Sequence, residues 1–261
     1  MTKTFSLFVV LALFLVIASP VMAVGNAFGQ ARASKAAERA QERLDNISEN
    51  LRERAQKEIS RRTEALNKLI TRISEFKKLS STQKSTLTTQ VQAQIDALNA
   101  LLTKINADTD VATLKTDVKS IVDSYRIYAL FIPQIQILGS ADKILSITDE
   151  MTTLSTTLEA KIGEQQAKGQ NVTDLQTLLT DMKAKIADAK TQAQAAIDAV
   201  TPLTPAGFPG NKTTLQSARQ MLTTAITDLN TARQDARQIV VGLMKLNKTT
   251  VTPTVTATPT P

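Results

Sequence analysis

Two aspartates have the spacing that begins a calcium-binding loop. The segment Asp108-Thr-Asp110 places carboxylates at the first and third positions of such a loop. An EF-hand loop also needs glycine at its sixth position and glutamate at its twelfth. Those positions hold Thr113 and Lys119. We therefore predict no metal here and interpret both aspartates as helix-start residues, because acidic side chains favour the first turn of a helix.

The chain lacks the side chains on which most enzymes depend. It contains no cysteine, no histidine and no tryptophan. Thiol nucleophiles, disulfides, the commonest general base and the commonest transition-metal ligand are all excluded. The sequence also has no glycine-rich phosphate loop and no nucleophile elbow. We therefore expect a protein that is not an enzyme and that binds no cofactor.

The segment 125–140 is nearly continuous in apolar residues and contains both tyrosines of the chain. We predict that it forms the centre of the core. Tyr125, Tyr128, Phe131 and Pro133 are a candidate cluster, with two possible roles. They either belong to the core, with the hydroxyls reaching the surface, or line a pocket beside a proline-kinked helix. We favour the core.

Residues 1–23 have the features of a secretory signal. Lys3 precedes an apolar run at 5–18, Pro20 follows it, and Val21 and Ala23 suit a signal peptidase. We predict cleavage after Ala23 and an exported chain on the cell surface or in the envelope space. An uncleaved anchor is the alternative, but a span needs about 20 apolar residues. No second run approaches that length, so we expect no transmembrane helix in the mature chain.

Basic residues are concentrated in the segment 24–78, which has 13 lysines and arginines against 8 acidic residues. The rest of the mature chain has 17 against 16. The segment either contacts an anionic polymer or membrane surface, or is a solvated helix with internal ion pairs. We favour the second role and do not expect nucleic acid, because acids are interleaved and no aromatic ring is available to stack on bases. The candidate contacts for an anionic partner are Arg32, Lys35, Arg39, Arg43, Arg52, Arg54, Lys57, Arg61 and Arg62.

Apolar residues recur at steps of three and four through most of the chain, which is the pattern of amphipathic helices. The inward-facing residues expected from this pattern include Leu154 and Ile226. We predict an all-α fold, an elongated antiparallel bundle of about six helices with one long N-terminal helix. The predicted parts are a signal peptide (1–23), a long basic amphipathic helix (24–78), a central helical bundle (79–200), a Pro-rich connector (201–211), a C-terminal helix packing on the bundle (212–248) and a disordered Thr/Pro-rich tail (249–261), a composition typical of spacers that accept sugars.

Several residues predict where helices start and stop. Ser80 and Gln83 have the spacing of a capping box and restart the helix after the first one. Pro133 favours a kink or a helix start near the residue before it. Gly139 offers a further break, and Gly169 a helix end.

The signal, the Tyr-Ala-Leu-Phe-Ile-Pro-Gln segment at 128–134, the Thr/Ala/Gln/Lys-rich helices and the Thr-Pro tail resemble secreted helical proteins of unassigned function from small-genome candidate-phyla bacteria. This resemblance implies no activity. A signal peptide with long basic helices is also similar to periplasmic holdase chaperones of the Skp type, although no strand segment is present to build their trimeric body.

We expect a non-catalytic structural or interaction protein of the cell surface or envelope. Its partner would be a protein or an envelope polymer, and the first helix could mediate self-association. The alternatives are a module whose basic first helix binds an anionic polymer or membrane surface, and a holdase-like chaperone.

Overall fold

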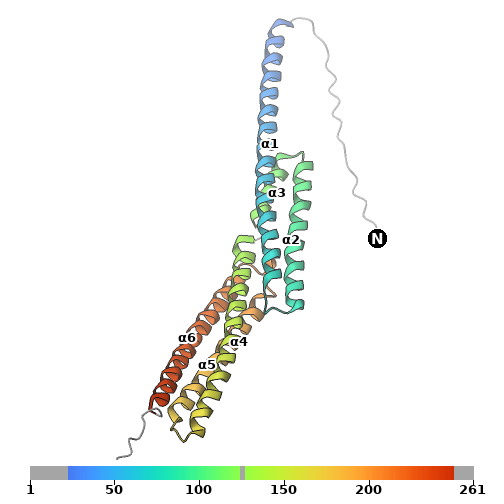
Figure 1. The fold of residues 1–261 in the computed structure, drawn as a ribbon. Coiled ribbons are helices and arrows are strands. Elements are labelled where there is room, and N and C mark those ends of the chain that lie inside the picture. Colours follow the sequence, from blue (N-terminus) through green and yellow to red (C-terminus); the bar gives the residue numbers. More distant parts are fainter. Residues whose placement is uncertain (1–22, 124–126, 250–261) are drawn as a thin grey trace, which may run out of the picture. The chain divides into compact units, whose positions relative to one another are not determined.

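The structure is a computed structural model that describes residues 23–123 and 127–249. The expected signal peptide before Ala23, the tail from residue 250 onward and Tyr125 lie outside the described residues. The prediction of an all-α bundle is confirmed, because the described part is almost entirely helical and contains no strand. Within it, no helix has the length and apolar character needed to cross a bilayer. The helices in Figure 1 are α1 (Ala23–Glu75), α2 (Ser81–Ala107), α3 (Val111–Asp123), α4 (Ile132–Ala167), α5 (Thr173–Val200) and α6 (Asn211–Thr249).

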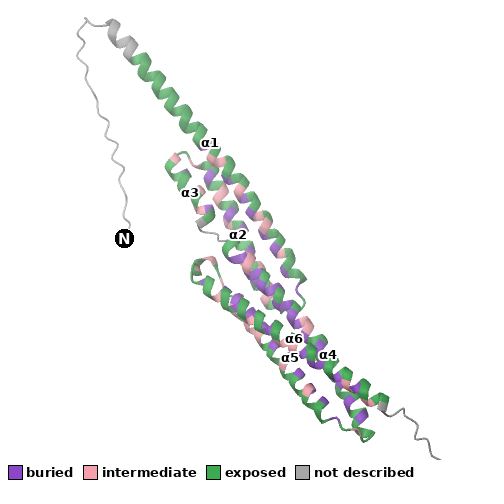
Figure 2. Cartoon of the chain, turned by 90° about the vertical axis from the view of Figure 1, so that its left-hand side faces the viewer, coloured by how far each residue is buried: buried purple, intermediate pink, exposed green. Residues whose placement is uncertain are grey.

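The chain divides into two compact units, Met1–Glu49 and Asn50–Pro261. In the first unit, the side chains of residues 30–47 are all exposed (Figure 2). We call this part of α1 the arm. The arm is a helix without a core of its own.

In the second unit, α4, α5 and α6 form a three-helix bundle with the spacing of a coiled coil. Buried residues follow one another at alternating steps of three and four, the heptad pattern that keeps one seam facing the partner helices. On α6 these residues are Leu215, Ala218, Leu222, Ala225, Leu229, Ala232, Ala236, Ile239 and Leu243. On α5 they are Leu175, Leu179, Met182, Ile186, Ala189, Ala193, Ala196 and Val200. On α4 they are Ile137, Ala141, Ile144, Thr148, Met151, Ser155, Leu158, Ile162 and Gln165.

Two side-chain hydrogen bonds fix the directions of these helices. Gln134 near the start of α4 donates from Nε2 to the carbonyl of Val200 at the end of α5, at 2.7 Å. Gln165 near the end of α4 donates to Oδ1 of Asn247 near the end of α6, at 2.9 Å. Helix α5 is therefore antiparallel to α4 and α6, which run parallel to each other (Figure 1).

The prediction that Leu154 and Ile226 face inward is wrong. Leu154 is 38% exposed and Ile226 50% exposed. Each lies one position away from a buried residue that continues the heptad, Ser155 on α4 and Ala225 on α6. At these places the heptad position decides which residue is buried, even where the buried side chain is small and its large apolar neighbour is exposed.

The second half of α1 packs with α2 and α3 in the same unit. Its buried residues again follow heptad spacing, and Arg62 occupies one of these positions. The capping box before α2 is present: Ser80 Oγ accepts from the N–H of Gln83 at 3.1 Å, and Gln83 Oε1 accepts from the N–H of Ser80 at 2.9 Å. The buried apolar residues are Ala55, Ile59, Leu66, Leu69 and Ile73 on α1, and Leu87, Val91, Ile95, Leu98 and Ile105 on α2.

The predicted apolar centre leads into α4 through a π-helical turn, Ile127–Phe131. Pro133 lies in the first turn of α4, directly after the π-helical turn, a position of the helix where proline is tolerated. The predicted break at Gly139 is wrong, because α4 continues through it to Ala167. The end predicted near Gly169 is correct, and Gly169 has a φ of 77°, a conformation that favours glycine.

Candidate anion-binding site

The positive excess of the first helix is confined to its second half. Residues 24–49 contain four basic and four acidic residues, a net charge of zero. Residues 50–78 contain nine basic and four acidic residues, a net charge of +5. The positive excess therefore lies on the packed half of α1, where residues 50–75 contain seven basic and four acidic residues, and on the two lysines that follow the helix.

The four candidate contacts in the arm are Arg32, Lys35, Arg39 and Arg43, and all are exposed. Three exposed acids, Glu38, Glu42 and Asp45, are interspersed with them along the arm. The arm is therefore a mixed-charge helix, which gives it little attraction for a polyanion.

Most of the other predicted contacts are engaged within the second unit. Arg52 Nη2 donates to the carbonyl of Asp108 at 2.6 Å. Lys57 pairs with Glu53 at 3.8 Å. Arg54 is exposed.

Arg61 and Arg62 share the carboxylate of Glu58 and lie over the ring of Tyr128. Arg61 pairs with Glu58 at 2.7 Å, and Arg62 contacts the same carboxylate. Their guanidinium carbons are 5.0 and 5.4 Å from the ring centroid, within cation–π range. Burial lowers the pKa of Arg62, and the charge interaction with Tyr128 partly offsets this. These side chains bind α1 to the turn before α4.

The predicted cluster around Pro133 is split between core and surface. Phe131 is buried, Pro133 is half-buried, and Tyr128 is 41% exposed under the two arginines. Tyr125 lies outside the described residues. The contacts of Tyr128 are thus structural.

The two aspartates of the calcium-like segment occupy separate helix ends. Asp110 directly precedes α3 and accepts from the N–H of Thr113 at 2.7 Å, which lowers the pKa of its carboxyl. Asp108 is the C-cap of α2, so only Asp110 has the predicted helix-start role. Across the described ranges, no group of three or more acidic side chains is arranged to hold a metal ion.

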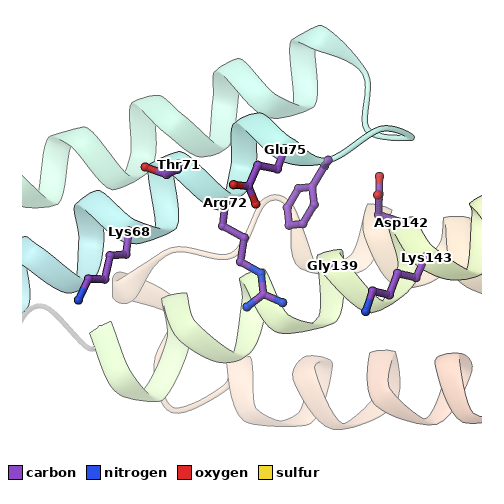
Figure 3. A pocket seen from close by; sticks show the side chains of 8 residues that line it. Lys68, Thr71, Arg72, Glu75, Gly139, Asp142 and Lys143 are labelled. Carbon is purple, nitrogen blue, oxygen red and sulfur yellow. The ribbon is translucent and has the colours of Figure 1, made fainter.

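A hollow of about 460 Å³ lies where the end of α1 meets α4 (Figure 3). Figure 3 shows Arg72 extending from α1 toward Gly139 on α4, with Lys143 one turn further along α4. The hollow is lined by Lys68, Thr71, Arg72, Glu75, Phe76, Gly139, Asp142 and Lys143.

Gly139 allows the guanidinium of Arg72 to lie close to the α4 backbone. A β-carbon at this position would be 3.2 Å from Arg72 Nη2 and 3.2 Å from Phe76 Cε1, which is tighter than most contacts of this kind. The glycine taken from the sequence as a helix break is therefore a point of close approach between two helices. In the sequence, the indication of this close approach was a glycine inside a strongly apolar segment.

The cations of the hollow differ in what they contact. Lys68 pairs with Glu64 at 2.6 Å. Asp142 is buried and accepts from the backbone N–H of Lys78 at 2.6 Å. Within the described part of the chain, neither Arg72 nor Lys143 forms an ion pair.

The hollow therefore offers a planar guanidinium and an ammonium group to the same space. Such a pair matches the oxygens of a carboxylate or phosphate, since arginine can bind both oxygens together and lysine adds a point charge. Two carboxylates also line the hollow, exposed Glu75 and buried Asp142, and Asp142 accepts from a backbone N–H rather than from either cation. Arg72 and Lys143 were not among the predicted contacts, because their proximity depends on how α1 packs against α4.

Comparison with protein-family models gives no match, and comparisons with curated proteins and with solved structures also give none.

Proposed function

We propose that the protein is an exported, non-catalytic bundle protein of the cell surface or envelope that binds an anionic envelope polymer. The observation that carries this proposal is that Arg72, from the positively charged half of α1, and Lys143 of α4 line the same hollow. The contact surface is the rigid half of α1 with the facing turn of α4. The missing histidine and cysteine support a role in binding rather than in catalysis.

A rigid cationic hollow favours a polymer with regularly spaced carboxylates or phosphates. Each repeat presents the group that Arg72 and Lys143 can hold, and neighbouring repeats extend over exposed Arg54 on the same half of α1 and exposed Lys77 just after the helix. The attraction is electrostatic, so it weakens as salt screens the charges.

The test is binding of the chain from Val24 to Pro261 to labelled polyphosphate and to alginate, at low and physiological salt. The double variant Arg72→Gln/Lys143→Gln removes the two cations of the hollow. We expect its affinity to fall about two- to thirty-fold, because each exposed charge pair contributes about 0.2–1 kcal/mol and 1.4 kcal/mol is a factor of ten.

The matched control is Lys35→Gln/Arg39→Gln, which removes the same charge from the arm. This control should bind as the unchanged chain does. Equal losses in both variants would mean that net charge alone drives binding and would refute the assignment to the hollow. Stronger binding to phosphatidylglycerol vesicles than to either polymer would replace the polymer with a membrane surface.

A further inference from the structure

A second surface, distinct from the basic hollow, is apolar and unoccupied by the chain's own described residues. It is a groove of about 550 Å³ between α4 and α6. Val241 and Met244 are 49% and 59% exposed there. The groove is lined by Met151, Leu154, Arg233, Ala236, Arg237, Val240, Val241 and Met244.

The groove follows a second heptad stripe on α6. Arg233, Arg237, Val240 and Met244 are spaced by four, three and four residues, parallel to the buried seam but turned out of the bundle. The apolar side chains that α6 gives to the groove are Ala236, Val240, Val241 and Met244, with the two arginines toward its N-terminal end, so α6 can contact helices on two sides. Three helices with an open apolar groove can therefore accept a fourth helix.

The arm of α1 carries an apolar stripe that is exposed among the described residues of its unit. Its members are again spaced by four and three residues, and Leu44 and Ile47 are 43% and 40% exposed. The N-terminal positions of the stripe are alanines, which allow close approach of another helix. The stripe consists of Ala33, Ala37, Ala40, Leu44 and Ile47.

Charge also distinguishes the two sides of this stripe. At 100° per residue, Glu38 and Asp45 lie on one side, and Arg39 and Arg43 lie on the other. The arm therefore has an acidic flank and a basic flank.

The two helices that form the groove carry opposite charges beside it. Arg233 and Arg237 are the charged members of the α6 stripe, and Glu150 lies one turn before Leu154 on the α4 side. Within the described ranges, Arg237 and Glu150 form no ion pair. The stripe from Arg233 to Met244 is about 17 Å long and that from Ala33 to Ile47 about 21 Å, at 1.5 Å per residue, so the two lengths match.

We infer that the groove binds the arm of a second copy of this chain, with the arm antiparallel to α6. In this orientation the acidic flank lies beside Arg233 and Arg237, and the basic flank beside Glu150. The parallel orientation would place the basic flank on the two arginines. The inference does not depend on the proposed anion binding, because it uses neither Arg72 nor Lys143.

Because the sequence contains no cysteine, an introduced cysteine is the one thiol available for cross-linking. Chains carrying Leu44→Cys are mixed with chains carrying Val240→Cys and treated with a short bismaleimide. We expect a cross-linked product of two chains from this mixture. The matched control is Glu42→Cys, which lies on the outer face of the arm and should give little product with Val240→Cys.

Sedimentation of the uncross-linked protein gives a second readout. The unchanged chain should associate with increasing concentration, to at least twice the mass of one chain. Leu44→Asp should shift the protein to single chains without changing its helix content, because Leu44 is exposed.

Four results would overturn the inference. They are single chains at all concentrations, association that survives Leu44→Asp, equal cross-linking from Glu42→Cys, and cross-linking of Leu44→Cys chains to one another in preference to Val240→Cys chains. The last result would show that two arms pair with each other.

Discussion

Replacing either of two glycines in the three-helix bundle with alanine should change the stability of the protein in opposite directions. Gly163 lies on α4 and Gly242 on α6, both within helices. A β-carbon at Gly163 would have no atom within 4 Å. A β-carbon at Gly242 would overlap the δ2 carbon of Leu175 on α5.

The expected magnitudes follow from helix propensity and packing. Alanine is about 0.8–1.0 kcal/mol more favourable than glycine inside a helix, so Gly163→Ala should stabilise the protein by about 1 kcal/mol. Gly242→Ala gains the same amount but forces the Leu175 side chain to move, and overpacking costs about 1–3 kcal/mol. We expect Gly242→Ala to be between neutral and about 2 kcal/mol less stable than the unchanged chain.

The assay is thermal unfolding followed by circular dichroism, with urea unfolding as a second measure of stability. A change of 1 kcal/mol corresponds to about 2–4 °C in melting temperature for a domain of this size. The control is Gly242→Ala in a Leu175→Ala background, where the obstruction is gone and the full gain of about 1 kcal/mol should return. Equal stabilisation by Gly163→Ala and Gly242→Ala would refute the packing of α6 against α5.

Three further predictions concern single sites. Burial and the neighbouring Asp181 raise the pKa of Asp235, so the folded protein holds this proton more tightly than the unfolded chain does. Stability is therefore lost as pH rises from about 4 through the folded pKa. Asp235→Asn should raise stability at pH 7 and flatten the pH dependence of stability, measured by urea unfolding. Ser80→Ala should lower stability by about 1 kcal/mol through loss of the cap, measured in the same way. Gly139→Ala should displace the Arg72 guanidinium and weaken polyphosphate binding, measured by anisotropy, with little change in helix content.

Each of these predictions has a result that contradicts it. A pH profile unchanged by Asp235→Asn would show that the carboxyl is solvated. Unchanged stability in Ser80→Ala would show that the capping hydrogen bond does not contribute to folding. Unchanged polyphosphate binding in Gly139→Ala would show that Arg72 does not contact the anion.

The helix boundaries that depend on local chemistry were predictable from the sequence. The capping box at Ser80, the helix start at Pro133 and the stop at Gly169 each use interactions within a few residues, so sequence spacing contains them. Gly139 was misassigned because its role is set by α1, which is distant in sequence.

The core was predictable in period but not in exact register. Ile226 and Leu154 fit a helical stripe by hydrophobicity, but the buried seam follows Ala225 and Ser155 instead. Which of two adjacent residues faces inward depends on the positions of the partner helices.

The candidate site was only partly predictable, because charge composition shows where basic residues lie along the chain and not which are engaged. Three of the predicted contacts are engaged within the unit. Arg52 contacts Asp108, and Arg61 and Arg62 contact Glu58 and Tyr128. The pair that remains available, Arg72 and Lys143, comes from helices far apart in sequence.

The order of the helices along the chain has a consequence for folding. Helices α4, α5 and α6 are consecutive and antiparallel neighbours, so their contacts close short loops and form early. Only the end of α1 must wait for α4, because Phe76 and Arg72 lie against Gly139, which is made later. During synthesis, Phe76 at the end of α1 therefore lacks its α4 contact until Gly139 has been made, and its ring is an apolar group exposed until then.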